Sequence, residues 1–298
     1  MTPLRRLAAA LLATTTALGV AGCGLRPGPA DPADPASGTA VRVLEVDGLD
    51  RGYLLHVPAD LADDPALVVM LHGGGGSGRQ AERAYGWTDL ADAHGFLVAY
   101  PDGVSRTWNA GDCCGPAARD DVDDVAFVTE LVATLQEEFA VSPERTFATG
   151  MSNGAMMAYR MACETDLFAA IAPVAGTIVT ACDDPTPTSV LHVHGLDDAM
   201  VRMDGERGAG PGRVDGMPVH DAFDVWLAAG TCSDPTTTAD GAVTTIASTC
   251  ADDHAVVLVT VAGAGHQWPG SVPREGAADP PSDALDASAL IREFFAAA

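Results

Sequence analysis

Apolar and polar positions follow two patterns along this chain, and the two patterns take turns. Short, nearly continuous apolar runs predict strands at 41–47, 52–57, 66–71, 96–100, 145–149, 169–174, 189–194 and 255–261. Apolar positions at helical spacing predict helices at 79–94, 122–139, 154–164, 217–229 and 284–296. Because these strands and helices alternate, we predict an α/β fold with a mostly parallel central sheet and helices on both faces.

The first residues do not follow this alternation and are typical of an export signal. Arg5 and Arg6 precede an apolar stretch at 7–20, and small residues then lead to Cys23. The small residues before the cysteine are also similar to a bacterial lipobox. We therefore predict a lipoprotein signal peptide at 1–22, lipidation of Cys23 and attachment to a membrane through that lipid. A plain secretory signal is the alternative.

Two further regions follow the signal. Residues 23–40 are rich in Pro and Gly and are predicted to form a disordered tether. The remainder, 41–298, has the size of one α/β domain and shows no internal repeat, so we predict a single domain there.

The charge balance of the chain indicates which classes of binding partner and substrate are favoured. The chain has 41 Asp and Glu against 16 basic residues, none of them Lys, for a formal net charge of −25. Nucleic acid binding is disfavoured because phosphates need a basic face. The charge favours solubility and neutral or weakly charged substrates. Nothing in the sequence implies a cofactor or an obligate protein partner.

No metal site is predicted. His72, His94 and His192 have no partners at metal-ligand spacing, and no C-x-x-C pair exists. Asp123 and Asp124 precede an apolar periodicity, which favours a helix N-terminus over a calcium loop.

A serine stands where a strand is predicted to turn sharply into a helix. Residues 150–154 read G-x-S-x-G, between the strand at 145–149 and the helix at 154–164. This is the context of a nucleophilic serine. Glycines at both ends let the strand and helix approach closely, so Ser152 is the candidate nucleophile.

An acid and a base follow Ser152 in the chain order that this motif requires. Asp197 and Asp198 come directly after the strand at 189–194, and His266 comes shortly after the strand at 255–261. The carboxyl ends of parallel strands form one edge of the sheet, where active sites lie. The residues alone allow either aspartate to act as the acid.

A glycine-rich loop at 72–78 follows the buried strand at 66–71. Backbone amides in such a loop can stabilise the oxyanion of acyl transfer. We expect the donors to be the amides of Gly74 and Asn153. No Lys follows the loop, so a phosphate-binding loop is disfavoured.

Several strings, in this order, resemble the secreted polyhydroxybutyrate depolymerase and feruloyl or acetylxylan esterase family. They are LHGG at 71–74, WNAGDCCGP at 108–116, VDDVAF at 122–127, GMSNGAMM at 150–157, HG at 194–195 with Asp198, and GHQWPG at 265–270. The resemblance covers about 41–296. It implies an α/β-hydrolase fold and serine ester hydrolysis.

Carried onto this chain, the resemblance marks Ser152, Asp198 and His266 as the catalytic triad. It also places Trp108 and Trp268 beside the site, where they would hold an acyl group or sugar ring, with ordinary core packing as the alternative. The segment 201–207 departs from the family pattern. Because this loop would border the site, the departure affects the expected substrate preference more than the expected reaction.

Apart from Cys23, the chain has an even set of cysteines, which in an exported protein implies disulfides. The preferred pairing joins Cys163 to Cys182 and Cys232 to Cys250, since each closes a modest loop. Cys113 and Cys114 then remain for each other or for another arrangement. A nucleophilic cysteine is disfavoured because neither has a fitting histidine nearby in sequence.

The sequence therefore predicts an exported serine esterase that hydrolyses feruloyl, acetyl or hydroxyalkanoate esters, either small or linked to a polysaccharide. Small or soluble esters are favoured over crystalline polymer because no appended binding module is seen. A peptidase of the same fold and a non-catalytic envelope lipoprotein are the alternatives. A peptidase usually carries a gating domain, and an intact set of Ser152, Asp198 and His266 argues against the lipoprotein.

Overall fold

The computed structural model describes residues 37–273 and 276–298. The predicted signal peptide at 1–22, the lipidation of Cys23 and most of the predicted tether lie outside these residues. The end of that tether, at 38–40, instead belongs to strand β1 (Gly38–Val46). These residues pair in register with the next strand, and the domain therefore begins before the predicted residue 41.

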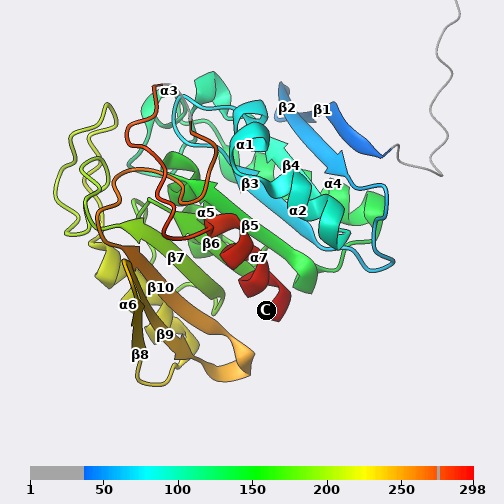
Figure 1. Cartoon of the computed structure of the whole chain (residues 1–298). Coiled ribbons are helices and arrows are strands. Elements are labelled where there is room, and N and C mark those ends of the chain that lie inside the picture. The colour runs from blue at the N-terminus through cyan, green and yellow to red at the C-terminus, as the bar shows by residue number, and fades with distance from the viewer. Residues whose placement is uncertain (1–36, 274–275) are drawn as a thin grey trace, which may run out of the picture. The chain divides into compact units, whose positions relative to one another are not determined.

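One ten-stranded sheet forms the centre of the domain, in the order β1-β2-β4-β3-β5-β6-β7-β10-β9-β8 (Figure 1). The other strands are β2 (Leu49–Val57), β3 (Leu67–Leu71), β4 (Leu97–Pro101), β5 (Thr146–Met151), β6 (Ala170–Val174), β7 (Ser189–Gly195), β8 (Thr236–Asp240), β9 (Val243–Thr249) and β10 (Ala255–Val261). Strands β4, β3, β5, β6, β7 and β10 pair parallel. The mostly parallel sheet is confirmed, and β1, β2, β9 and β8 extend it with antiparallel edges.

The central strands are buried along their whole length. All residues of β3, β4, β5 and β6 are buried, as the continuous apolar runs predict for parallel strands covered on both faces. Strand β8 is exposed throughout and rich in Thr. Neither β8 nor β9 is among the predicted strands, because neither shows an apolar run in the sequence.

Helices cover both faces of the sheet (Figure 1). They are α1 (Gly78–Ala84), α2 (Trp87–His94), α3 (Gly115–Arg119), α4 (Asp124–Phe139), α5 (Asn153–Glu164), α6 (Val219–Gly230) and α7 (Ala287–Ala297). Apolar side chains of α4, α5 and α6 belong to one core cluster, and those of α1, α2 and α7 belong to a second. No helix in the described ranges is both long and apolar enough to cross a membrane.

The single helix predicted at 79–94 is two helices in the structure. Gly86 separates α1 from α2 in a left-handed conformation with φ 72°, which glycine adopts without steric cost. The predicted start of α4 agrees better with the structure. Asp123 is its N-cap and accepts a hydrogen bond from the amide of Ala126 at 2.8 Å.

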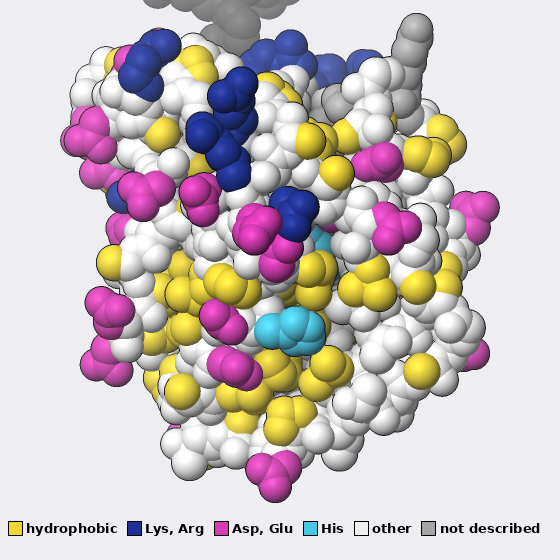
Figure 2. All heavy atoms as spheres, turned by 90° about the vertical axis from the view of Figure 1, so that its left-hand side faces the viewer, with side chains coloured by type: hydrophobic (Ala, Val, Ile, Leu, Met, Phe, Trp, Pro, Cys, Tyr) yellow, Lys and Arg dark blue, Asp and Glu magenta, His cyan; other side chains and the backbone are white. Residues whose placement is uncertain are grey.

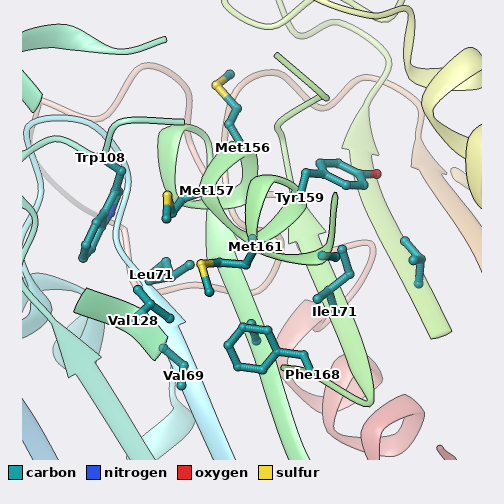
Figure 3. Packing of buried hydrophobic residues seen from close by; sticks show 14 of the residues in the cluster. Val69, Leu71, Trp108, Val128, Met156, Met157, Tyr159, Met161, Phe168 and Ile171 are labelled. Atoms are coloured by element: carbon teal, nitrogen blue, oxygen red, sulfur yellow. The ribbon is translucent and has the colours of Figure 1, made fainter. Parts of the chain in front are cut away.

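Helix α5 follows Ser152, and its burial is nearly complete. Met157 and Met161 on one side of the helix belong to the same core cluster as Leu71 of β3 and Val128 of α4 (Figure 3). A helix embedded in this way has little freedom to shift. The residue at its N-terminus is therefore held in a fixed place relative to the sheet.

Candidate active site

Ser152 lies in the turn between β5 and α5, and its backbone adopts an uncommon conformation. Its φ is 55° and its ψ is −116°, outside the regions that residues with side chains usually occupy. The amide of Ser152 donates to the carbonyl of Val174 at 2.9 Å. The turn presents the side chain away from the core, where it is partly exposed.

The two glycines of the motif are required by close packing. A Cβ atom on Gly154 would lie 2.3 Å from the carbonyl oxygen of Leu71, and one on Gly150 would lie 2.5 Å from the carbonyl of Gly154. No ordinary contact is this short, so a side chain on Gly154 would push α5 away from β3, and one on Gly150 would push α5 away from β5. The close approach of strand and helix expected at these glycines is therefore present.

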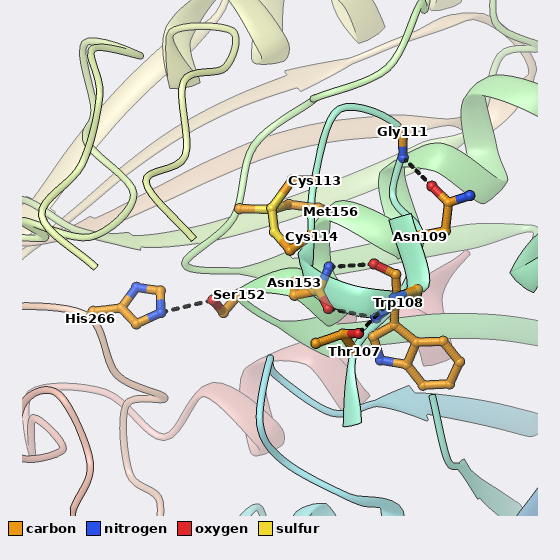
Figure 4. The surroundings of a disulfide bond; sticks show 11 residues. Thr107, Trp108, Asn109, Gly111, Cys113, Cys114, Ser152, Asn153, Met156 and His266 are labelled. Atoms are coloured by element: carbon orange, nitrogen blue, oxygen red, sulfur yellow. Dashed lines mark hydrogen bonds between the residues drawn. A yellow bond between two sulfur atoms is a disulfide. The ribbon is translucent and has the colours of Figure 1, made fainter. Parts of the chain in front are cut away.

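The structure brings Ser152, His266 and Asp198 together in one hydrogen-bonded series. Nε2 of His266 lies 2.9 Å from Oγ of Ser152 (Figure 4). Nδ1 of His266 lies 2.8 Å from Oδ2 of Asp198. An ionised carboxylate only accepts, so Nδ1 carries the proton and Nε2 is free to accept one from the serine.

Asp198 and its neighbour Asp197 lie in different surroundings. Asp198 is buried, and its second oxygen accepts the amides of Met200 and Val201, both at 2.8 Å. Burial opposes its ionisation, but the hydrogen bond and charge of His266 outweigh burial and lower the pKa of Asp198. Asp197 is exposed. The structure therefore places Asp198, and not Asp197, against the imidazole.

A chain of buried polar groups lies behind Asp198, and sequence reasoning did not find it. Nε2 of His194 lies 2.8 Å from the carbonyl of Val201 and 3.6 Å from Asp198. Nδ1 of His194 lies 2.9 Å from Nε2 of His192, whose Nδ1 lies 2.6 Å from the hydroxyl of Tyr159.

The carbonyl of Val201, at the end of this hydrogen-bonded series, fixes the direction of each hydrogen bond in the series. Because a carbonyl only accepts, Nε2 of His194 is the donor, and each neutral histidine then accepts through Nδ1. Burial lowers the pKa of both His192 and His194, which agrees with neutral rings. His192 is therefore structural, as predicted. The hydrogen-bonded series from Tyr159 to Val201 holds the segment that carries Asp198 in place.

His266 is held by a further residue that the sequence analysis missed. The backbone amide of His266 donates to Oδ2 of Asp279 at 2.7 Å. Asp279 follows His266 by thirteen residues in an irregular segment. No local pattern marks it, since the contact depends on how this segment folds back.

The glycine-rich loop packs directly beside Ser152. A Cβ on Gly73 would lie 3.6 Å from Cβ of Ser152, and one on Gly74 would lie 3.7 Å from Cβ of Asn153. Asn153 is the first residue of α5, so its amide has no acceptor within the helix. The amides predicted as oxyanion donors thus belong to two residues, Gly74 and Asn153, that lie side by side next to the serine.

His72 fixes the start of this loop. Its Nδ1 donates to the carbonyl of Gly73 at 2.9 Å, and its Nε2 accepts the amide of Gly103 at 3.0 Å. Burial lowers the pKa of His72, which keeps the acceptor nitrogen unprotonated. His72 is a structural residue, as the sequence analysis predicted.

Trp108 does not line the site, which corrects the prediction made from the family pattern. Its side chain is fully buried, and its indole nitrogen donates to the carbonyl of His72 at 2.9 Å. Its backbone forms two hydrogen bonds with the side-chain amide of Asn153, at 2.7 and 3.0 Å (Figure 4). Trp108 therefore links the glycine-rich loop to the serine turn, because its indole binds His72 and its backbone binds Asn153.

A cavity of about 900 Å³ opens beside Ser152 and His266. Its walls are the glycines at 73–76, the loop at 199–214 and the segment that follows His266. Trp268 is among the lining residues, as predicted, and stacks on Tyr85 with ring centroids 4.5 Å apart. This volume falls in the range of small-molecule sites.

The six cysteines of the domain form three pairs, which are Cys113–Cys114, Cys163–Cys182 and Cys232–Cys250. The last two are the pairs preferred from the sequence, and of the two arrangements left open for Cys113 and Cys114 the structure has them joined to each other. Cys114 lines the cavity and lies near Met156 of α5 (Figure 4). The adjacent pair therefore forms part of the cavity wall.

Comparison with known proteins places this geometry in a family. The family described as esterase PHB depolymerase matches residues 51–205. The chain belongs to this esterase family. NocK of Nocardia uniformis subsp. tsuyamanensis, assigned as an esterase, is 33% identical over 257 residues, which cover 78% of this chain and 74% of NocK. The resemblance read from the sequence is confirmed.

Fungal members of the esterase family are similar over a shorter region. An acetylxylan esterase of Coprinopsis cinerea is 33% identical over 166 residues, which cover 54% of this chain and 44% of that protein. The chain thus spans about half the length of such relatives. The structure of an acetyl xylan esterase from Aspergillus awamori covers 87% of this chain with a TM-score of 0.61 at 18% identity, which confirms the α/β-hydrolase fold.

Proposed function

We propose that this esterase hydrolyses carboxylic esters through a triad of Ser152, His266 and Asp198. The observation that carries the proposal is the series of two hydrogen bonds from Ser152 through His266 to the buried Asp198. Membership of the esterase family supports the same chemistry. The reaction is acyl transfer to the serine and then to water.

In the first half of the reaction, Oγ of Ser152 attacks the ester carbonyl carbon while Nε2 of His266 takes the hydroxyl proton. The imidazolium then gives this proton to the leaving alcohol as the ester C–O bond breaks. Asp198 holds Nδ1 of His266 protonated and stabilises the imidazolium. An acyl-enzyme and a free alcohol result.

In the second half, His266 removes a proton from water, and the resulting hydroxide attacks the acyl carbon. The bond to Oγ breaks as Ser152 takes the proton back, which releases the carboxylic acid. In both halves the carbonyl oxygen gains negative charge. The amides of Gly74 and Asn153 would donate to it, a contribution of about 3 to 4 kcal/mol for a well-placed donor.

The substrate would be an ester of feruloyl, acetyl or hydroxyalkanoate type. A cavity of about 900 Å³ has room for an aromatic acyl group as well as a short one. Trp268 and Tyr85, which stack on each other, are both among the residues that line it. Relatives described as feruloyl esterase C and acetylxylan esterase support this range of substrates.

The test is hydrolysis of a p-nitrophenyl ester series, methyl ferulate and a hydroxybutyrate oligomer by residues 24–298 and by Ser152→Ala. We expect activity on at least one ester and its loss in the variant. A domain inactive on every ester, or an unaffected Ser152→Ala variant, would contradict the proposal. Cleavage of peptides but not esters would favour the peptidase.

We further propose that the enzyme is exported and anchored by a lipid at Cys23. The signal-like sequence before this residue and the paired cysteines of the domain support this location. Mass spectrometry of the protein from its native membrane should find a diacylglycerol adduct on Cys23. A Cys23→Ala variant should lack the adduct and leave the membrane fraction.

A further inference from the structure

One wall of the cavity carries a positive charge. Arg213 lies in the loop between β7 and α6, near the segment where the sequence departs from the family pattern. It is exposed and lines the cavity. Among the described residues of the lining, it is the one Lys or Arg side chain.

Arg213 also lacks an acidic partner, in a chain rich in acids. Within the described ranges, eight other arginines form ion pairs with Asp or Glu, namely Arg42, Arg51, Arg79, Arg119, Arg145, Arg160, Arg202 and Arg292. Arg213 forms no ion pair and no side-chain hydrogen bond with the part of the chain described. Arg207 on the same loop forms none either, but it does not line the cavity.

The backbone holds Arg213 against the cavity. Its amide donates to the carbonyl of Gly210 at 3.0 Å, and the amide of Gly208 donates to the carbonyl of Val214 at 2.9 Å. A Cβ on Gly212 would lie 3.7 Å from Sγ of Cys114, which lines the same cavity. The loop therefore packs against the cavity wall at Cys114, while 211–213 are exposed to solvent.

The conformation of Arg213 is itself uncommon. Its φ is 46°, in the left-handed region that residues with side chains seldom adopt. Such residues concentrate at ligand sites and turns, where the surrounding structure imposes the conformation. Here the turn at 210–213 imposes it and presents the side chain to the cavity.

A guanidinium in this place matches a carboxylate. It is always charged, and its planar donors fit two carboxylate oxygens at once. Asp279, the acidic residue of the described lining, already accepts the amide of His266. No ion pair joins Asp279 to Arg213 in the described residues, which leaves the guanidinium open to an anion from outside.

The rest of the molecule is strongly acidic, which affects how an anion can bind at Arg213. Acidic side chains are spread over the face in Figure 2, while arginine side chains lie in its upper part. With a net charge of −25, the molecule repels anions in general. An anionic substrate therefore needs a cation at the site to be accepted.

We propose that this enzyme prefers esters that carry a carboxylate away from the bond to be cleaved, and that Arg213 binds that carboxylate. The inference rests on the proposed esterase function and narrows its substrate class. It also revises the sequence-based expectation of neutral or weakly charged substrates.

Two matched substrate pairs test the proposal. The dimer of 3-hydroxybutyrate with a free carboxylate and its primary amide have the same size and differ in charge on the alcohol side. Monomethyl glutarate and the methyl ester of glutaric acid monoamide differ in the same way on the acyl side. Product chromatography gives kcat/KM for the wild type, Arg213→Gln, Arg213→Lys and Arg207→Gln.

We expect the wild type to prefer the anionic member of at least one pair, and the preferred pair tells which side of the ester carries the carboxylate. Arg213→Gln should lower kcat/KM for that substrate roughly three- to thirtyfold, between the effect of an exposed ion pair and that of a charged hydrogen bond. The neutral member should change less than about twofold, and added salt should reduce the preference. Arg213→Lys should keep part of the preference, and Arg207→Gln should keep all of it.

The proposal is wrong if the wild type prefers the neutral member of both pairs, or if Arg213→Gln affects both members of each pair equally. Ser152→Ala separates this failure from failure of the proposed function. If that variant still cleaves all four esters, the triad assignment is wrong. If it cleaves none while Arg213→Gln shows no selective loss, only the inference about Arg213 fails.

Discussion

At the scale of single residues, the contrast between Asp197 and Asp198 shows how surroundings assign a role. The two carboxylates are adjacent in sequence, yet only Asp198 is buried and hydrogen-bonded to His266. Its pKa is lowered despite burial, so it is ionised at neutral pH and can hold the imidazole tautomer.

Asparagine substitutions at the two positions should therefore have opposite outcomes. In Asp198→Asn, the side chain no longer holds the proton of His266 on Nδ1, so Nε2 is not reliably free to accept the serine proton. We expect kcat for ester hydrolysis to fall roughly 10³- to 10⁴-fold. Asp197→Asn should change kcat by less than about twofold, because surface substitutions have small effects. Steady-state kinetics of both purified variants checks this, and a crippled Asp197→Asn beside an active Asp198→Asn would reverse the assignment.

Sequence reading finds residues like Ser152 because strand, turn and helix signals surround it. It could not find Asp279, or the chain of His194, His192 and Tyr159. Their roles depend on contacts between segments far apart in sequence, as for Tyr159 and His192, which are 33 positions apart. Trp108 was misplaced for the same reason, since a motif position does not tell which way a side chain points.

At the scale of elements, the junction of β3, β5 and α5 determines where the nucleophile lies. The apolar runs of both strands and the glycines near the end of β5 and the start of α5 are visible in the sequence, and this part of the fold was predicted. The glycines permit the contact that brings the turn onto the end of β3. The position of Ser152 is thus a consequence of packing between elements.

Gly154→Ala should disrupt that junction. The added methyl group would lie 2.3 Å from the carbonyl oxygen of Leu71, and α5 would have to move. We expect a loss of about 1–3 kcal/mol in the free energy of unfolding, as for other overpacked cores, together with a large loss of kcat. Gly52→Ala in β2 is the matched control, because its Cβ would meet nothing closer than 4.0 Å. Urea denaturation and ester hydrolysis would show the difference, and equal behaviour of the two variants would contradict it.

The elements that sequence reading missed lack an apolar pattern. Strands β8 and β9 are polar and form the edge of the sheet. The turn between them is Gly241-Ala242, and a two-residue loop that begins with Gly is a hairpin signal that was present and unused. The break between α1 and α2 was missed because the apolar periodicity continues through Gly86.

The disulfides join elements that are neighbours in space. Cys163 near the end of α5 pairs with Cys182 after β6, at a sequence separation of 19. Opening a loop of this length by Cys163→Ser with Cys182→Ser should cost about 3 kcal/mol in the free energy of unfolding. Chemical denaturation of the double variant beside the wild type, both without reductant, measures the loss. A wild type whose peptide map shows these two thiols free would contradict the pairing.

At the scale of the whole molecule, histidine burial and net charge act on stability in different pH ranges. His72, His192 and His194 are buried, and burial lowers the pKa of each. The 41 carboxylates give the molecule its net charge of −25, and they titrate mostly below pH 5. Between about pH 7.5 and 5.5, the histidines therefore dominate the change in stability.

Stability should fall as the pH falls through this range. A histidine with a lowered folded-state pKa binds protons more readily when the chain is unfolded. Its contribution to the free energy of unfolding is therefore complete above the unfolded-state pKa of about 6.5. That contribution is lost as the pH drops toward the folded-state pKa. At pH 5.5, about one unit below the unfolded pKa, each of the three histidines lowers the free energy of unfolding by on the order of 1 kcal/mol at most. The Tm should fall accordingly.

Thermal unfolding at constant ionic strength, from pH 7.5 to 5.5, measures this effect. His192→Gln retains an amide donor and acceptor for Tyr159 and His194 but cannot take up the proton, so its Tm should depend less on pH. His94→Gln, at an exposed histidine, should show the wild-type slope. A wild-type Tm that stays constant over this range would mean that the buried histidines do not couple folding to protons. A slope that His192→Gln leaves unchanged would locate the coupling at His72 or His194 instead, where protonation would break the hydrogen bond from Gly103 or the chain behind Asp198.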